Sequence, residues 1–274
     1  MDTDAALEYA RRHRLEAFVV RRGADVVAQA YGDGFSLETP HKLFSGTKSF
    51  WGVAAIIAQR EGILKLDEPV CETIEAWRDD RWKRRVTLRM LLTLTAGHAF
   101  GGLGSAVPIY DRALEMPLAN EPGSTFTYTG ISLQVFGAVF AQKVRALDMT
   151  PHEYLRDRVL QPANSAVATW RSLSDGTQPL PTGVAMSAAE WSSYGCYVLD
   201  RSVEFADCFH GTSANPRYGL GWWLDAPAGG AAVIPYAIGS GGQGLYLLAS
   251  SDAAVVHFGA GGSYKHDAML RRLR

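Results

Sequence analysis

Cysteine is scarce in this sequence of 274 residues, in which only Cys71, Cys196 and Cys208 occur. Their number is odd, and no two of them have the CxxC spacing typical of thiolate zinc sites. Both observations argue against a disulfide framework and against a tetrahedral zinc site. We therefore expect buried free thiols and no metal.

An excess of charge of one sign is also lacking. The sequence has 27 basic and 28 acidic residues, which leaves a net charge of -1. A protein with so little net charge has no large field of one sign to hold nucleic acid or an anionic membrane surface. We therefore expect a small-molecule partner and no nucleic acid.

Long apolar runs are absent as well. The longest one, Trp51 to Ala58, is too short to span a bilayer. The first residues, Met-Asp-Thr-Asp, are acidic, and no apolar segment typical of a secretory signal follows them. These features predict a soluble, cytoplasmic protein without a membrane span, and they leave its oligomeric state open.

Strand patterns gather at the two ends of the chain. Glu16–Arg21 and Asp25–Tyr31 are rich in Val and Ala and are joined by a hairpin-like Arg22-Gly23. Further short strands, separated by Gly or Asp turns, are predicted at Leu220–Leu224, Ala232–Ile238, Gly244–Leu248 and Ala253–Phe258.

Helical patterns dominate the middle of the chain, where strand signals nearly vanish between Leu64 and about Val203. The predicted helical segments include Thr87–Leu94, Ile131–Val144 and Pro151–Val159. We therefore predict an α+β fold, in which an antiparallel sheet is made from both chain ends and terminal helices cover one face. The expected sheet domain comprises residues 1–63 and 204–274, and residues 64–203 form an inserted all-helical domain. A site would lie in the cleft between them.

The tetrad Ser45-Gly46-Thr47-Lys48 lies at the predicted start of a helix that ends near Gly62. Residues i and i+3 of a helix are neighbours, so the Lys48 ammonium can reach the Ser45 hydroxyl. The helix N-terminus adds backbone N–H groups and a positive dipole end beside that oxygen. A serine becomes nucleophilic when a neighbour takes its proton, and a desolvated lysine can do so. The apolar helix that follows favours such desolvation.

A serine that caps a helix, followed by a lysine that faces solvent, would have the same Ser-x-x-Lys sequence. The tetrad alone is therefore compatible with a capping residue as well as with a catalytic pair. The segments around it decide between the two interpretations.

Six segments around and beyond the tetrad carry the decisive patterns: Lys42–Lys48, Gly62–Val70, Val86–Gly97, Pro122–Tyr128, Tyr218–Trp222 and Gly239–Gly244. They resemble the penicillin-recognising serine hydrolases, which include class C β-lactamases, D,D-peptidases and β-lactamase-like carboxylesterases. Order and spacing agree along nearly the whole chain. The resemblance implies a β-lactamase/transpeptidase-like fold, with Ser45 as nucleophile and Lys48 as its partner. It implies no metal or organic cofactor.

The resemblance also implies roles for three further parts of the chain. Tyr128 would move a proton between Ser45 and the leaving group. The backbone N–H groups of Ser45 and Gly242 would form the oxyanion hole, where glycine lets a strand edge approach the substrate carbonyl. The residues expected to border the substrate are Ser240, Gly241 and Gly130.

Two departures from the family pattern bear on the substrate. Gly130 replaces the Asn of the family's Tyr-x-Asn motif, and Gly239 replaces the Lys or His of its third motif. Loss of a charge-assisted contact to a substrate carboxylate would cost about 1.5–3 kcal/mol. The sequence thus predicts hydrolysis of a small ester or amide with a neutral flank, through an acyl-enzyme.

Two other functions remain open. A β-lactamase or D-amino-acid peptidase would use the same residues on a β-lactam or peptide substrate. A catalytically weak binding or sensor protein would keep the fold and lose the activity, as the glycines at positions 130 and 239 suggest.

Other catalytic motifs are missing or misplaced. No Gly-x-Ser-x-Gly nucleophile elbow and no HExxH occur. The run Gly239–Gly244 fits GxGxxG, but it leads into a predicted strand rather than a helix, which argues against a dinucleotide site.

Overall fold

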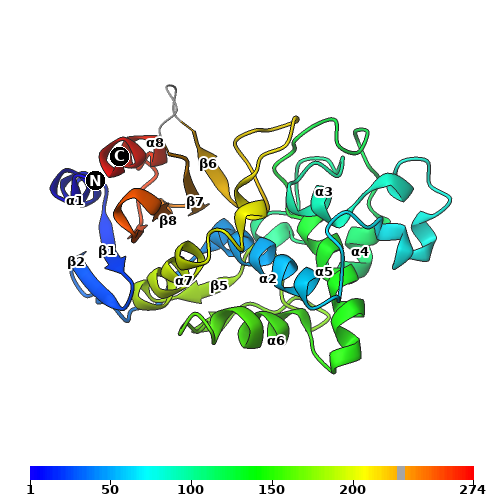
Figure 1. The fold of residues 1–274 in the computed structure, drawn as a ribbon, viewed down its shortest axis with the longest axis horizontal. Coiled ribbons are helices and arrows are strands. Elements are labelled where there is room, and N and C mark those ends of the chain that lie inside the picture. Colours follow the sequence, from blue (N-terminus) through cyan, green and yellow to red (C-terminus); the bar gives the residue numbers. More distant parts are fainter. Residues whose placement is uncertain (227–231) are drawn as a thin grey trace.

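The computed structural model describes residues 1–226 and 232–274. Its main element is a six-stranded antiparallel sheet with the strand order β2-β1-β9-β8-β7-β6. The strands are β1 (Leu15–Arg22), β2 (Asp25–Tyr31), β6 (Trp223–Asp225), β7 (Ile234–Gly239), β8 (Gln243–Leu248) and β9 (Ala253–Gly259). Because β1 pairs with β9, the two ends of the chain share one sheet, as predicted (Figure 1).

Alternate residues of the strands serve two different cores. Phe18 and Val20 of β1 face the core beneath the terminal helices α1 (Thr3–Arg11) and α8 (His266–Leu273). Ala17 and Val19 belong to the larger core on the other face. The expectation that terminal helices cover one face of the sheet is confirmed (Figure 1).

The inserted region is mainly helical. Its helices are α3 (Leu88–Leu92), α4 (Tyr110–Glu115), α5 (Ile131–Val144), α6 (Pro151–Leu155) and α7 (Ala188–Asp200). Short 3₁₀ helices occur at Phe44–Lys48, Val70–Glu72, Glu75–Trp77, Lys83–Arg85, Gly104–Ala106, Arg145–Leu147, Ala206–Phe209 and Ala249–Ser251, and a π-helical turn occurs at Arg156–Leu160.

Two features differ from the predicted all-helical domain of residues 64–203. A second, three-stranded sheet joins β3 (His41–Lys42), β5 (Val184–Met186) and β4 (Thr169–Trp170), and two of its strands lie within that domain. These strands are too short to show an alternating pattern in the sequence. Helix α7, moreover, packs on β1, β8 and β9 of the main sheet. Gly195 permits this approach, because a Cβ there would lie 2.7 Å from the Leu245 side chain.

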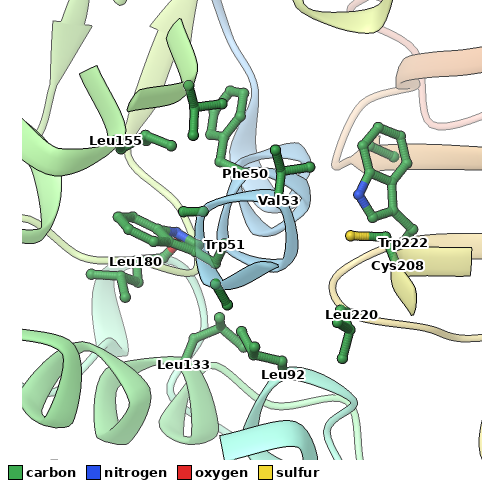
Figure 2. Packing of buried hydrophobic residues seen from close by; sticks show 14 of the residues in the cluster. Phe50, Trp51, Val53, Leu92, Leu133, Leu155, Leu180, Cys208, Leu220 and Trp222 are labelled. Carbon is green, nitrogen blue, oxygen red and sulfur yellow. The ribbon is translucent and has the colours of Figure 1, made fainter. Parts of the chain in front are cut away.

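Helix α2 (Ser49–Arg60) runs through the middle of the molecule (Figure 1). It is apolar on nearly all sides, as is typical of a buried helix. Figure 2 shows Trp51 directed towards Leu180, while Trp222 lies beyond the opposite side of the helix. The helix is thereby held between the helical region and the sheet, and its N-terminus is fixed where the two regions meet.

Within residues 1–226 and 232–274, each helix is too short or too polar to cross a bilayer. Cys196 and Cys208 are buried, Cys71 is half-buried, and all three are free thiols.

Candidate active site

Ser45 lies in the 3₁₀ helix Phe44–Lys48, which leads directly into α2. The residue before it, Phe44, has a φ of 48°, a left-handed conformation that non-glycine residues adopt rarely. This turn redirects the chain from β3 into the helix and leaves Ser45 half-buried at the helix N-terminus. Such strained residues cluster at functional sites, where the surrounding structure holds them.

Lys48 is buried beside the serine. Its Nζ lies 2.9 Å from Ser45 Oγ and 3.2 Å from the carbonyl oxygen of Pro181, and its side chain has a relative exposure of only 1%. Burial lowers the pKa of Lys48 to about 7, because the charged ammonium loses its hydration. The neutral amine, which can accept the Ser45 proton, is therefore accessible near neutral pH.

Tyr128 completes the group. Its ring centroid lies 4.8 Å from Lys48 Nζ, and its ring stacks on Trp223 at a centroid distance of 5.7 Å. Burial raises the pKa of Tyr128, while its side-chain hydrogen bonds with Ser45 and Trp223 act in the opposite direction. The phenol thus keeps its proton at neutral pH and is placed to donate it.

No side chain fits at position 130. A Cβ on Gly130 would lie 1.9 Å from the carbonyl oxygen of Gly102. The loop that carries Gly102 is tied to this segment, because Gly130 N–H and Thr129 Oγ1 each donate a hydrogen bond of 2.9 Å to the Gly101 carbonyl. The loop that carries Gly102 therefore occupies the space that a side chain at position 130 would need. Lys48 has the Pro181 carbonyl as its second hydrogen-bond acceptor, after Ser45 Oγ.

Position 239 is equally closed. A Cβ on Gly239 would lie 2.1 Å from the carbonyl oxygen of Leu43 and 3.2 Å from the Cβ of Phe44. Glycine is required where two backbones approach this closely. The end of β7 thus lies directly against the loop that carries the nucleophile.

The remaining predicted residues lie in the turn between β7 and β8. Ser240 and Gly241 are exposed, whereas Gly242 is buried with a φ of 95°. A Cβ on Gly242 would lie 3.1 Å from the ring of Tyr264, and the Gly242 carbonyl accepts a hydrogen bond of 2.7 Å from His257 Nδ1. Of the glycines in this run, Gly239 is the one in close contact with the nucleophile's loop.

Two cavities adjoin that loop and share Lys42 and Phe44 in their walls. One, of about 500 Å³, is also lined by Arg171, and the other, of about 450 Å³, by Ser240 and Gly241. Both cavities lie beside the loop that carries Ser45, and neither has Ser45, Lys48 or Tyr128 in its wall. In the part of the chain that the structure describes, no group of three or more His, Cys, Asp or Glu residues could hold a metal ion.

Several residues of the site were not predicted from the sequence. Pro181 and Gly102 act through backbone carbonyls, for which a sequence carries no signal. Trp223 was expected from the sequence as a core or cleft-wall residue, and not as a partner of Tyr128. Its stacking on Tyr128 appears only once the fold brings the two together.

The sequence model described as Beta-lactamase matches residues 6–193, well over half of the chain. The chain belongs to the β-lactamase family. A curated β-lactamase from Yersinia enterocolitica is 30% identical over 132 residues, which make up 45% of this chain and 32% of that enzyme. The alignment with this relative of the family thus spans about a third of the relative's length.

Solved structures share the fold of this β-lactamase-family protein. EstCE1, described as a hydrolase with promiscuous acyltransferase activity, superposes with a TM-score of 0.80 at 14% identity, covering 99% of this chain and 97% of that one. A class C β-lactamase from Rhodobacter sphaeroides gives 0.75 at 15% identity, covering 98% of each. An octameric penicillin-binding protein homologue from Pyrococcus abyssi gives 0.74 at 18% identity, covering 99% and 76%. The predicted β-lactamase/transpeptidase-like fold is confirmed.

Proposed function

We propose that this member of a hydrolase family is a serine hydrolase that cleaves small esters or amides through an acyl-enzyme on Ser45. The observation that carries the proposal is the contact between the buried Lys48 and the half-buried Ser45. Lys48 Nζ lies 2.9 Å from Ser45 Oγ, with a pKa of about 7, and Tyr128 lies beside both. An exposed lysine that merely accompanied a capping serine would have neither the burial nor this pKa.

The first half of the reaction forms the acyl-enzyme. The neutral amine of Lys48 takes the hydroxyl proton of Ser45 while Oγ bonds to the substrate carbonyl carbon. The tetrahedral oxyanion then collapses and expels the alcohol or amine, which receives a proton from the phenol of Tyr128. Lys48, now an ammonium at 4.8 Å from the ring of Tyr128, returns a proton to the phenolate.

The oxyanion needs backbone donors, and Ser45 N–H at the helix N-terminus is one of them. We assign the second to the end of β7, at the Ser240 N–H, rather than to Gly242 as the sequence suggested. The contact of Gly239 with the Leu43 carbonyl supports this choice, because it brings the strand end beside the nucleophile. Gly242, by contrast, packs on Tyr264.

The second half of the reaction is hydrolysis. Water loses a proton to the Lys48 amine, its oxygen attacks the acyl carbon, and the Ser45 oxygen leaves with a proton restored to it. The carboxylic acid is released, and the three side chains return to their starting states. Every proton is accounted for by groups of this chain and by water.

Positions 130 and 239, which have no room for a side chain, favour a substrate with a neutral flank. Neither Gly130 nor Gly239 can carry the side chain that would bind a carboxylate or a substrate amide. We expect p-nitrophenyl butyrate to be hydrolysed faster than nitrocefin at equal concentration, with Ser45→Ala as the inactive control. Faster cleavage of nitrocefin by the same preparation would show that the substrate is a β-lactam.

β-Lactam or D-amino-acid peptide hydrolysis is the second candidate, and one observation favours it besides the family. Lys42 and Arg171 line the cavity of about 500 Å³ next to Phe44. A substrate carboxylate in that cavity could pair with the side chains of Lys42 and Arg171, which lie outside the third motif. A Lys42→Ala variant that lost nitrocefin hydrolysis and kept ester hydrolysis would support this candidate.

A further inference from the structure

The turn between β7 and β8 is held from within by a buried amide. Gln243 has a relative exposure of 5%, and its Nε2 donates hydrogen bonds of 3.2 Å to the Ser240 carbonyl and 2.7 Å to the Gly259 carbonyl. Its Oε1 accepts a hydrogen bond of 3.4 Å from Gly259 N–H. One side chain therefore ties the first residue of the turn to β9, the neighbouring strand.

A buried imidazole holds the other end of the same turn. His257 of β9 is fully buried, and its ring stacks on Tyr264 at a centroid distance of 4.0 Å. Its Nδ1 lies 2.7 Å from the Gly242 carbonyl, so Nδ1 must carry the hydrogen and donate it. Burial lowers the pKa of His257 to about 3, which keeps the ring neutral and this tautomer in place at working pH.

These contacts matter because two of the residues in the turn are glycines. Gly241 and Gly242 both have positive φ values, and glycine has the largest conformational freedom of any residue. An oxyanion donor must be placed within a few tenths of an ångström before the reaction, since a donor that must first reorganise loses most of its effect. A loop of glycines cannot supply that rigidity by itself.

We propose that Gln243 and His257 are positioning residues that fix the end of β7 and its turn, and through them the Ser240 N–H, for transition-state stabilisation. The inference rests on the proposed function. Neither side chain touches the substrate in this account. Gln243 acts on the Ser240 carbonyl directly, and His257 acts through Gly242.

The test compares two disrupting variants with one conservative variant in the full chain. Gln243→Glu replaces the amide donor with a carboxylate facing two carbonyl oxygens. His257→Phe keeps the ring stack on Tyr264 and removes the donor, whereas His257→Asn keeps a donor near the place of Nδ1. For each variant, kcat and KM for p-nitrophenyl butyrate and the Kd of phenylboronic acid are measured at a temperature at which thermal denaturation shows it folded.

We expect kcat to fall about tenfold in Gln243→Glu and His257→Phe, less than the 10²- to 10³-fold loss that follows removal of an oxyanion donor. KM should stay within twofold, the boronate should bind about tenfold more weakly, and His257→Asn should recover most of both losses. If either disrupting variant does not fold, the other still tests the turn.

Folded variants with the kcat and the boronate Kd of the wild type would overturn the inference and leave the proposed function intact. A fall in His257→Asn as large as that in His257→Phe would also overturn the role of the imidazole donor. A wild-type protein that neither hydrolyses the ester nor binds the boronate would overturn the proposed function itself, and the positioning role with it.

Discussion

Lys48 Nζ lies 2.9 Å from Ser45 Oγ at a point where the lysine side chain is 1% exposed. The same lysine donates a second hydrogen bond, of 3.2 Å, to the Pro181 carbonyl. Neither partner carries a negative charge that would stabilise the ammonium. Desolvation therefore goes uncompensated and lowers the pKa of Lys48 to about 7, which makes the lysine a base rather than a counter-ion.

The pH dependence of acylation follows from this pKa. Below pH 7 Lys48 is protonated and cannot accept the Ser45 proton, so kcat/KM for an ester should rise about tenfold per pH unit there. Above pH 7 it should level off, because the pKa of Tyr128 is raised and the phenol stays protonated. Initial rates from pH 5 to 9 check this prediction. A profile with no inflection between pH 6 and 8 would contradict it.

Replacement of the lysine should remove activity and increase stability at once. The pKa of Lys48 is about 7 in the folded protein and 10.5 when the side chain is hydrated in the unfolded chain, so the unfolded chain binds more protons between these values. Wild-type stability therefore rises with pH across this window, and the burial penalty is fully present below pH 7. At pH 6, Lys48→Met should be more stable by up to about 5 kcal/mol, as measured by urea denaturation.

The matched control is Lys42→Met, which removes the charge of a lysine that is exposed to solvent in the folded protein. Lys42→Met should change stability by less than about 0.5 kcal/mol at any pH. The gain in Lys48→Met should shrink as the pH approaches 10. A gain that is absent at pH 6, or that grows with pH, would mean that the lysine is not desolvated.

Tyr128→Phe should separate proton delivery from packing. The phenylalanine keeps the ring that stacks on Trp223, so stability should change by less than about 1 kcal/mol. The loss of a general acid should lower kcat for an alkyl ester by 10²- to 10⁴-fold. An activated p-nitrophenyl ester, whose leaving group needs no proton, should lose much less. Equal losses on both substrates would argue against proton donation by Tyr128.

Restoring the family's side chains should damage this protein. Gly130→Asn places a Cβ 1.9 Å from the Gly102 carbonyl, and Gly239→Lys places one 2.1 Å from the Leu43 carbonyl. Each should destabilise the fold by about 3 kcal/mol without improving β-lactam hydrolysis. Ser240→Lys is the control for stability alone, because that neighbouring position is exposed and should tolerate a long side chain without loss of stability. Thermal denaturation and nitrocefin rates measure both effects.

The fold was predictable where a pattern is local. The helix over Ile131–Val144 was predicted with the bounds that the structure shows, because its apolar run is long and ends in charged residues. A sheet shared by both chain ends was predicted from the strand patterns at those ends, and the observed pairing of β1 with β9 confirms it. The two-residue strand Thr169–Trp170 carries no such pattern and was missed.

The site was predictable only in part, for a physical reason. Ser45 and Lys48 are neighbours on one helix, so their contact is local. The Pro181 carbonyl lies 133 residues from Lys48 along the chain. Every residue has a backbone carbonyl, so the sequence does not indicate which one accepts a hydrogen bond. Gly130 was interpreted from the sequence as a lost amide, but the structure shows that its space is taken by Gly102.

Intact-mass measurement after incubation with a fluorophosphonate shows whether Ser45 is the nucleophile that forms a covalent enzyme intermediate. We expect one adduct per chain in the wild type, formed faster as the pH rises through 7, and none in Ser45→Ala. Lys48→Met should label much more slowly. A wild type without an adduct would instead indicate a binding or sensor protein that keeps the fold, and an adduct that persists in Ser45→Ala would place the nucleophile elsewhere.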